Sequence, residues 1–213
     1  MKKLFLLAFV ALGLHAMAQH VTPLNVTIAD VKLDSLRTLY IQEPPLYRAA
    51  LDVAAGQLNK NADELKDAKK ELKSEQGLAK EMDSSLKNAA KTSANLKKLY
   101  EKEEQEMKSM QKAIEGQQKA LGKQKDLNPE LRNNYMSLLE SQQKDLGFSI
   151  REVAERKKSL SELDSQIQNF QTALQNYLQE IQAKADKIAE LEGILKERTA
   201  TVKAEQKAAK SLQ

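Results

Sequence analysis

The stretch Leu-Gly-Lys-Gln-Lys-Asp-Leu-Asn-Pro-Glu-Leu at positions 121–131 interrupts a long run of helix-favouring sequence, and it decides the fold. It holds one of only four prolines and one of only seven glycines in a chain of 213 residues. Gly122 fits a left-handed helix stop, Asn128 fits a helix N-cap and Pro129 fits the first helical position. We therefore predict a hairpin tip marked by Gly122, Asn128 and Pro129, at which the chain folds back.

Apolar residues repeat every seven positions on both sides of this tip. Such sustained spacing is typical of a coiled coil, because a 3.5-residue repeat keeps one seam facing a partner helix over many turns. The row at heptad position a runs from Leu51 to Leu121 before the tip and from Leu139 to Ala209 after it, so the two rows have equal lengths. The predicted seam consists of Leu51, Leu58, Leu65, Leu72, Leu86, Met107, Ile114, Leu121, Leu139, Leu146, Val153, Leu160, Ile167, Leu174, Ile181, Ile188, Leu195 and Val202.

These rows predict an all-α fold, namely a long antiparallel two-helix coiled-coil hairpin with a short irregular N-terminal segment that has room for one strand. At about 1.5 Å per residue, each helix would be a rod of roughly 110 to 120 Å. The predicted division of the chain is a signal peptide at 1–18, an N-terminal segment at 19–45, a first helix at 46–122, a tip at 123–128 and a second helix at 129–213.

The second seam row, at heptad position d, is half polar. If the chain folds back at the tip, its polar members meet within about a turn as Glu75 with Lys184, Glu103 with Arg156, Gln117 with Gln142, and Asn61 with Arg198. Polar seam residues can fix register and orientation at a cost in stability. They can also be solvated edges of an imperfect seam, and the sequence leaves both interpretations open.

The first residues predict export. Lys2 and Lys3 precede an apolar run, Leu4 to Leu14, which is too short to span a membrane of ~30 Å as a helix. Ala16-Met17-Ala18 fits the pattern that signal peptidase cuts after, so we expect an exported chain, periplasmic or secreted, that begins at Gln19 and has no membrane span after cleavage. Cleavage leaves 32 basic and 30 acidic residues, interleaved along the same helices, which argues against nucleic-acid binding.

Residues 19–45 differ in character from the heptads. The β-branched stretch from Leu24 to Leu33 alternates at Val26 and Ile28 and would suit a short strand. Asp34 would cap a brief helix through Tyr40, which Pro44-Pro45 would close. A lone strand has no stability by itself, so this segment would lie along the coiled coil, stay mobile or join a sheet with other copies, and the sequence does not choose.

The sequence offers almost no chemistry for catalysis. There is no cysteine, and His20 would be one residue from the mature terminus, where nothing holds a base in place. Exposed carboxylates on heptad helices are solvated charges of ordinary acidity, and there is no glycine-rich phosphate loop or metal-ligand cluster. We therefore predict a non-enzymatic protein with no catalytic residue, no cofactor, no metal and no small-molecule substrate.

A signal sequence followed by a helical hairpin resembles the plan of the Skp-type periplasmic chaperones. In those proteins helical arms extend from a small trimeric β body and hold unfolded outer-membrane proteins, and Val26 to Leu33 would supply a body strand here. The chain departs from that plan where a returning strand is needed, because it ends in the helix-like Lys-Ala-Ala-Lys-Ser-Leu-Gln. The resemblance implies a holdase function and a homo-oligomer.

The function expected from the whole sequence is a scaffold, spacer or protein-docking rod in the bacterial envelope. The chain spends about 160 residues on two helices and almost none on a site. The alternatives are the holdase and a coiled-coil regulator of a cell-wall hydrolase. Each needs a protein partner, whose identity the sequence does not give, and whether the chain associates with copies of itself stays open.

Overall fold

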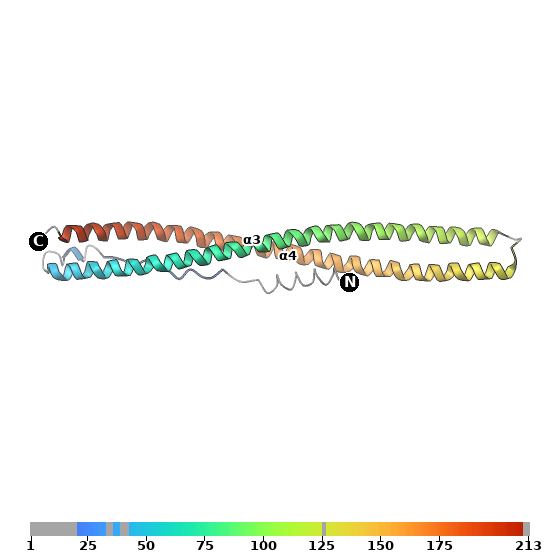
Figure 1. Ribbon diagram of the computed structural model, residues 1–213, viewed down its shortest axis with the longest axis horizontal. Coiled ribbons are helices and arrows are strands. Elements are labelled where there is room, and N and C mark those ends of the chain that lie inside the picture. Colours follow the sequence, from blue (N-terminus) through green and yellow to red (C-terminus); the bar gives the residue numbers. More distant parts are fainter. Residues whose placement is uncertain (1–20, 33–35, 39–42, 125–126, 211–213) are drawn as a thin grey trace. The chain divides into compact units, whose positions relative to one another are not determined.

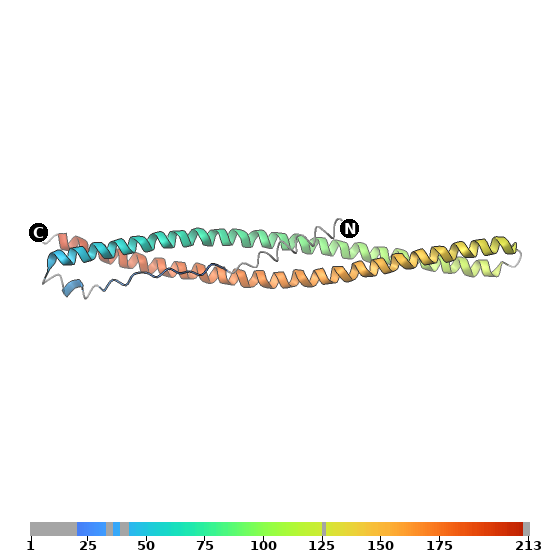
Figure 2. The same cartoon turned by 90° about the horizontal axis from the view of Figure 1, so that it is seen from below.

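The computed structural model describes residues 21–32, 36–38, 43–124 and 127–210. Two long helices, α3 (Pro44–Lys123) and α4 (Pro129–Lys210), pack against each other as a helical hairpin (Figures 1 and 2). None of the described residues forms a strand. The predicted fold class is therefore confirmed, while the predicted signal peptide lies outside the described residues.

The start of α3 is set by a pair of prolines. Proline lacks an N–H group, and the first N–H groups of a helix have no partner within it, so Pro44 and Pro45 are tolerated in the first turn. The N–H of Tyr47 donates to the carbonyl of Glu43 at 3.1 Å, which places Glu43 at the N-cap. The helix thus begins two residues before Leu46, where we expected it to begin after the prolines.

The start of α4 has the cap that the sequence indicates. Asn128 Oδ1 accepts a hydrogen bond from the N–H of Glu130 at 2.9 Å, and Pro129 is the first residue of the helix. An asparagine cap satisfies an N–H group that the helix cannot pair internally. Asn128 and Pro129 therefore fix where the returning helix begins.

The end of α3 differs from the prediction. Gly122 lies inside the helix, and no described glycine has a positive φ, so the predicted left-handed stop at Gly122 is wrong. Instead, the N–H of Gln124 donates to the carbonyl of Leu121 at 3.3 Å. A short bond of this type tightens the last turn and lets the helix end without a left-handed residue.

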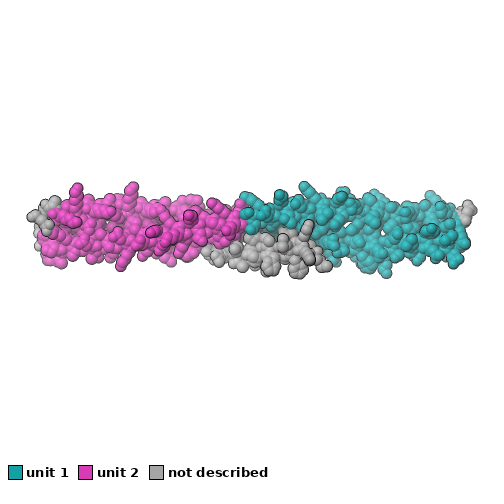
Figure 3. Space-filling view, viewed as in Figure 1, with its two compact units in different colours: residues 1–16, 84–172 teal, residues 17–83, 173–213 magenta. Residues whose placement is uncertain are grey.

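The described chain divides into two compact units, each made of paired segments of α3 and α4 (Figure 3). The first unit comprises residues 84–172, and the described part of the second comprises residues 21–83 and 173–210. Of the predicted seam residues, Leu72, Met107, Leu121 and Leu195 are half-buried. The other fourteen are buried, namely Leu51, Leu58, Leu65, Leu86, Ile114, Leu139, Leu146, Val153, Leu160, Ile167, Leu174, Ile181, Ile188 and Val202.

The core of the 84–172 unit is a row of small apolar clusters. Tyr100 packs with Val153 and Leu160, and Ile114 packs with Leu139 and Leu146. Ser93, the polar member of the a row, is buried, and its hydroxyl donates to a carboxylate oxygen of Asp164 on the other helix. In each of these contacts a residue of α3 packs against residues of α4, so the seam of this unit is closed.

Candidate functional site

Residues 21–32, called the strap from here on, lie in extended conformation along the hairpin within the second unit (Figures 1 and 2). The sequence left three placements of this segment open, and the structure shows the one along the coiled coil. Ile28 of the strap is 7% exposed and belongs to the same apolar cluster as the helix residues around it. That cluster includes Leu51, Leu58, Leu65, Ile188 and Leu191, and the half-buried Leu24, Val26 and Val31 of the strap pack against it.

Asn61 of α3 holds the strap by its main chain. Its Nδ2 donates to the carbonyl of Thr27 at 3.0 Å, and its Oδ1 accepts the N–H of Ala29 at 2.9 Å. These two groups flank Ile28, so the amide side chain of Asn61 pairs with the strap much as a neighbouring strand would. A second bond from Nδ2 to Glu64, also at 3.0 Å, orients the amide.

Arg198 of α4 binds the strap next to Asn61. Its guanidinium donates to the carbonyl of Ile28 at 2.9 Å and also to the carbonyl of Ala29. A terminal nitrogen of the same group lies 3.5 Å from a carboxylate oxygen of Asp30. Asn61 and Arg198 therefore hold four consecutive residues of the strap, Thr27 to Asp30, and only the contact with Asp30 depends on a strap side chain.

The beginning of the strap meets two carboxylates. The N–H of Thr22 donates to Glu75 Oε1 at 2.9 Å, and the N–H of Val21 lies 3.4 Å from Glu180 Oε2. Glu75 is also the partner of Lys184, whose Nζ lies 3.0 Å from both carboxylate oxygens. The strap thus contacts the carboxylate that pairs with Lys184, the one buried lysine among the described residues.

The helical turn between the strap and α3, residues 36–38, is fastened to α4 by Glu205. Arg37 donates to Glu205 Oε1 at 2.7 Å, and the hydroxyl of Tyr47 donates to Glu205 Oε2 at 2.7 Å. The hydrogen bond from Tyr47, followed by the bond and charge of Arg37, holds the pKa of the Glu205 carboxyl below its usual range. The ends of the predicted brief helix, Asp34 and Tyr40, lie outside the described residues.

The four polar d pairs expected from the sequence each have a different outcome. Glu75 and Lys184 form a buried ion pair, and Glu103 and Arg156 approach to 3.8 Å, which is too long for a hydrogen bond. Asn61 and Arg198 both turn to the strap. In place of the expected contact between Gln117 and Gln142, the adjacent residues Gln118 and Gln143 form an exposed hydrogen bond of 3.2 Å.

The polar d residues of the second unit form the candidate functional site. Four of them belong to the pairs expected from the sequence, and Glu205 follows Arg198 by one heptad in the same row. Each contacts the strap, the turn before α3 or a residue that holds the strap. What Asn61, Glu75 and Arg198 offer to the strap is hydrogen bonding to its extended main chain. The five residues are Asn61, Glu75, Lys184, Arg198 and Glu205.

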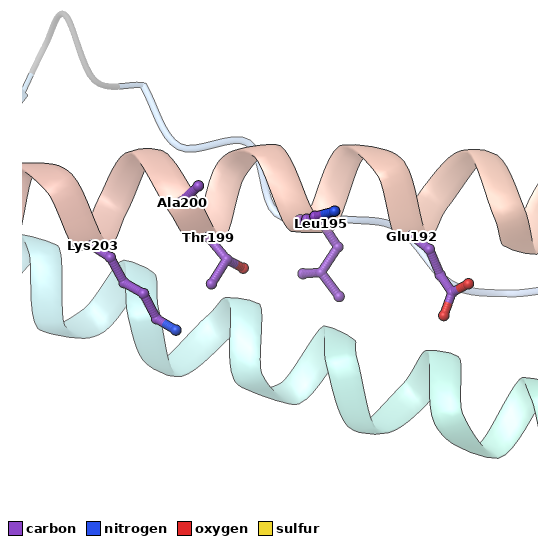
Figure 4. A pocket seen from close by; sticks show the side chains of 6 residues that line it. Glu192, Leu195, Thr199, Ala200 and Lys203 are labelled. Carbon is purple, nitrogen blue, oxygen red and sulfur yellow. The ribbon is translucent and has the colours of Figure 1, made fainter.

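A shallow cavity of about 410 Å³ lies on α4 in the same unit. Figure 4 shows Leu195, Thr199 and Lys203 pointing from α4 toward α3, with Glu192 at one end. Glu192 pairs with Lys69 of α3. The cavity is lined by one leucine and by the stems and heads of solvated side chains, so its surface offers no concentrated binding chemistry.

In the 84–172 unit, the most perturbed carboxyl group is that of Glu104. Hydrogen bonds from Lys108 and, across the hairpin, from Lys157 at 2.6 Å lower its pKa to about 2. Both lysines remain solvated, so the shift reflects a surface ion network rather than a reactive group. The neighbouring cavity of about 350 Å³ is floored by Met107, Ile150 and Val153.

In the described part of the chain, no group of three or more His, Cys, Asp and Glu side chains is arranged to hold a metal ion. Neither α3 nor α4 contains an apolar window long enough to cross a membrane. His20 lies outside the described residues. No family model, curated protein or solved structure gives a significant match to the chain.

Proposed function

We propose that the chain is an exported, non-enzymatic coiled-coil protein that acts as a scaffold, spacer or protein-docking rod in the bacterial envelope. The observation that carries the proposal is the closed seam. In both units the apolar a residues of α3 and α4 are mostly buried against each other. A seam that is buried between the chain's own two helices stabilises the hairpin and is not available to a client.

A holdase would need the same seam residues to be exposed rather than buried. To clamp an unfolded client between its arms, the hairpin would have to expose Leu86, Leu160 or Ile188, which are at most 5% exposed. One observation favours that alternative, namely that the second unit already holds an extended segment, the strap, largely by its main chain. The two functions therefore differ in whether the seam opens.

An aggregation assay separates the two functions. The mature chain, beginning at Gln19, is mixed at stoichiometric ratio with an unfolded outer-membrane protein, and light scattering follows the aggregation of that protein. A scaffold leaves the scattering unchanged and sediments as an elongated particle. Suppression of aggregation, or sedimentation as a compact sphere, would overturn the proposal.

Export and partners are tested in cells. Fractionation followed by N-terminal sequencing should find the chain in the periplasm or medium with Gln19 as its first residue, and a chain that keeps Met1 in the cytoplasm would refute export. Cross-linked capture from the envelope then identifies the docked protein. Recovery of a cell-wall hydrolase in that capture would favour the regulator over a general scaffold.

A further inference from the structure

The strap depends on few side chains for its position. Among residues 21–32, all of them described, Ile28 alone is buried, while Leu24, Val26 and Val31 are half-buried. The cluster around Ile28 also contains residues of both helices, such as Leu58 of α3 and Ile188 of α4, which do not depend on the strap to belong to the buried seam. Segments with few buried contacts open at lower free energy than the core. The strap can therefore leave its groove while α3 and α4 stay paired.

The groove left behind is a specific binding surface for an extended chain. Asn61 pairs with main-chain groups on both sides of one residue, and Arg198 pairs with that residue's carbonyl. Ile28 fills an apolar site between the helices, and Arg198 also faces Asp30. The matching ligand has free main-chain groups, a β-branched aliphatic residue and an acid two positions later.

We propose that this groove is an exchange site, in which the strap of a second copy of the chain replaces the chain's own strap. The sequence from Val21 to Lys32 is the one that the structure shows to satisfy Asn61, Arg198 and the Ile28 site together. Each copy carries both the groove and the matching segment. When two copies exchange straps, each groove is filled by the strap of the other copy and every groove contact is kept. The free-energy cost is therefore little more than that of bringing the two copies together. The inference rests on the groove alone and is independent of export and of the scaffold function.

The required affinity can be bounded. The chain's own strap is present at its groove at an effective concentration of roughly 1 mM. If it fills the groove about nine-tenths of the time or more, the Kd of the groove for a separate strap is about 0.1 mM or tighter. The intact chain should then be monomeric at micromolar concentration. Exchanged pairs should accumulate only as the concentration of the chain approaches ~1 mM.

Complementation between two variants of the mature chain tests the exchange. Ile28→Asp disables the strap and leaves the groove intact. Asn61→Ala combined with Arg198→Ala disables the groove and leaves the strap intact. Each variant alone should be a monomer by sedimentation equilibrium, whereas the mixture should form a 1:1 complex with a Kd of about 0.1 mM or below. Excess synthetic peptide of residues 21–32 should dissociate the complex, and the same peptide with Ile28→Asp should not.

Several outcomes would overturn the proposal. One is a mixture that stays monomeric at 0.5 mM, about five times that bound, although both variants keep the helical circular dichroism of the parent. Another is competition by the Ile28→Asp peptide as strong as that of the parent peptide. Capture of an unrelated unfolded polypeptide in preference to the strap would replace the second copy with a different occupant.

A measurement on the unmodified sequence guards against variants that fold poorly. Copies with isotope-labelled isoleucine methyl groups are mixed at ~1 mM with unlabelled copies, and isotope-filtered spectra record contacts between different molecules. Exchange predicts contacts from the methyl groups of Ile28 to helix residues of the unlabelled copy. Their absence, with the contacts within one molecule intact, would refute the exchange.

Discussion

Replacement of Glu75 by glutamine should destabilise the second unit strongly, because it leaves a buried ammonium group without its main counter-charge. The side chain of Lys184 is 4% exposed and that of Glu75 is 12% exposed, with 3.0 Å between Nζ and the carboxylate. Glutamine keeps the shape of the side chain and an acceptor for the N–H of Thr22, so the change isolates the charge. Breaking a buried pair in this way costs about 3–5 kcal/mol.

A neighbouring carboxylate reduces that figure. Glu71 lies 3.7 Å from the Lys184 ammonium, and although its side chain is 57% exposed, it keeps part of the attraction. We therefore expect Glu75→Gln to lower the free energy of unfolding by about 2–3 kcal/mol. The double variant Glu75→Leu, Lys184→Leu removes both charges and should be neutral or up to ~2 kcal/mol more stable than the parent.

Urea unfolding followed by circular dichroism at 222 nm measures these differences, with sedimentation of each variant to detect a change in association. The matched control is Glu190→Gln, which removes the partner of Lys187 in a pair whose side chains are 53% and 55% exposed, and it should change stability by less than ~1 kcal/mol. If Glu75→Gln cost no more than the control, the buried pair would contribute no more to the stability of the second unit than an exposed pair does.

Three further predictions follow from individual residues. The pKa of the Glu205 carboxyl is lower in the folded chain than its value of about 4.5 in the unfolded chain, so the bonds from Tyr47 and Arg37 stabilise the fold fully above pH 4.5. This stabilisation is lost as the pH falls through the folded pKa. The urea midpoint of the parent, measured as a function of pH, should show the loss, and that of Glu205→Gln should not. Ile188→Asp places a charge at a side chain 2% exposed and should cost at least ~3 kcal/mol by urea unfolding. Gly193→Ala meets no atom within 4 Å and should leave the thermal midpoint equal or raise stability by up to ~1 kcal/mol.

The hairpin was predictable because its cause is periodic. Burial of one apolar stripe over many turns requires the same heptad register along both helices. Many residues, Leu58 and Ile188 among them, therefore give the same evidence for the hairpin. Asn128 and Pro129 were equally readable, since capping depends on the local sequence. Gly122 was not, because a helix end can tighten its last turn instead of using a left-handed residue, and both choices suit glycine.

The strap groove was harder to predict, since polar d residues have two uses that share one sequence pattern. In the 84–172 unit, Glu103 faces Arg156 across the hairpin, whereas in the second unit Asn61 and Arg198 face the strap. The chemical difference between the two pairs was nonetheless visible in the sequence. Glutamate can neutralise arginine, but asparagine cannot.

An arginine in the seam opposite an asparagine therefore needs an acceptor from elsewhere. Main-chain carbonyls meet that need, and the asparagine amide, with both a donor and an acceptor, pairs with main chain as well. The carbonyls of Thr27, Ile28 and Ala29 supply those acceptors here. A charge-unbalanced polar pair in a heptad seam, on a chain that also carries a short β-branched segment outside the heptads, thus predicts that the segment docks at that level of the coiled coil.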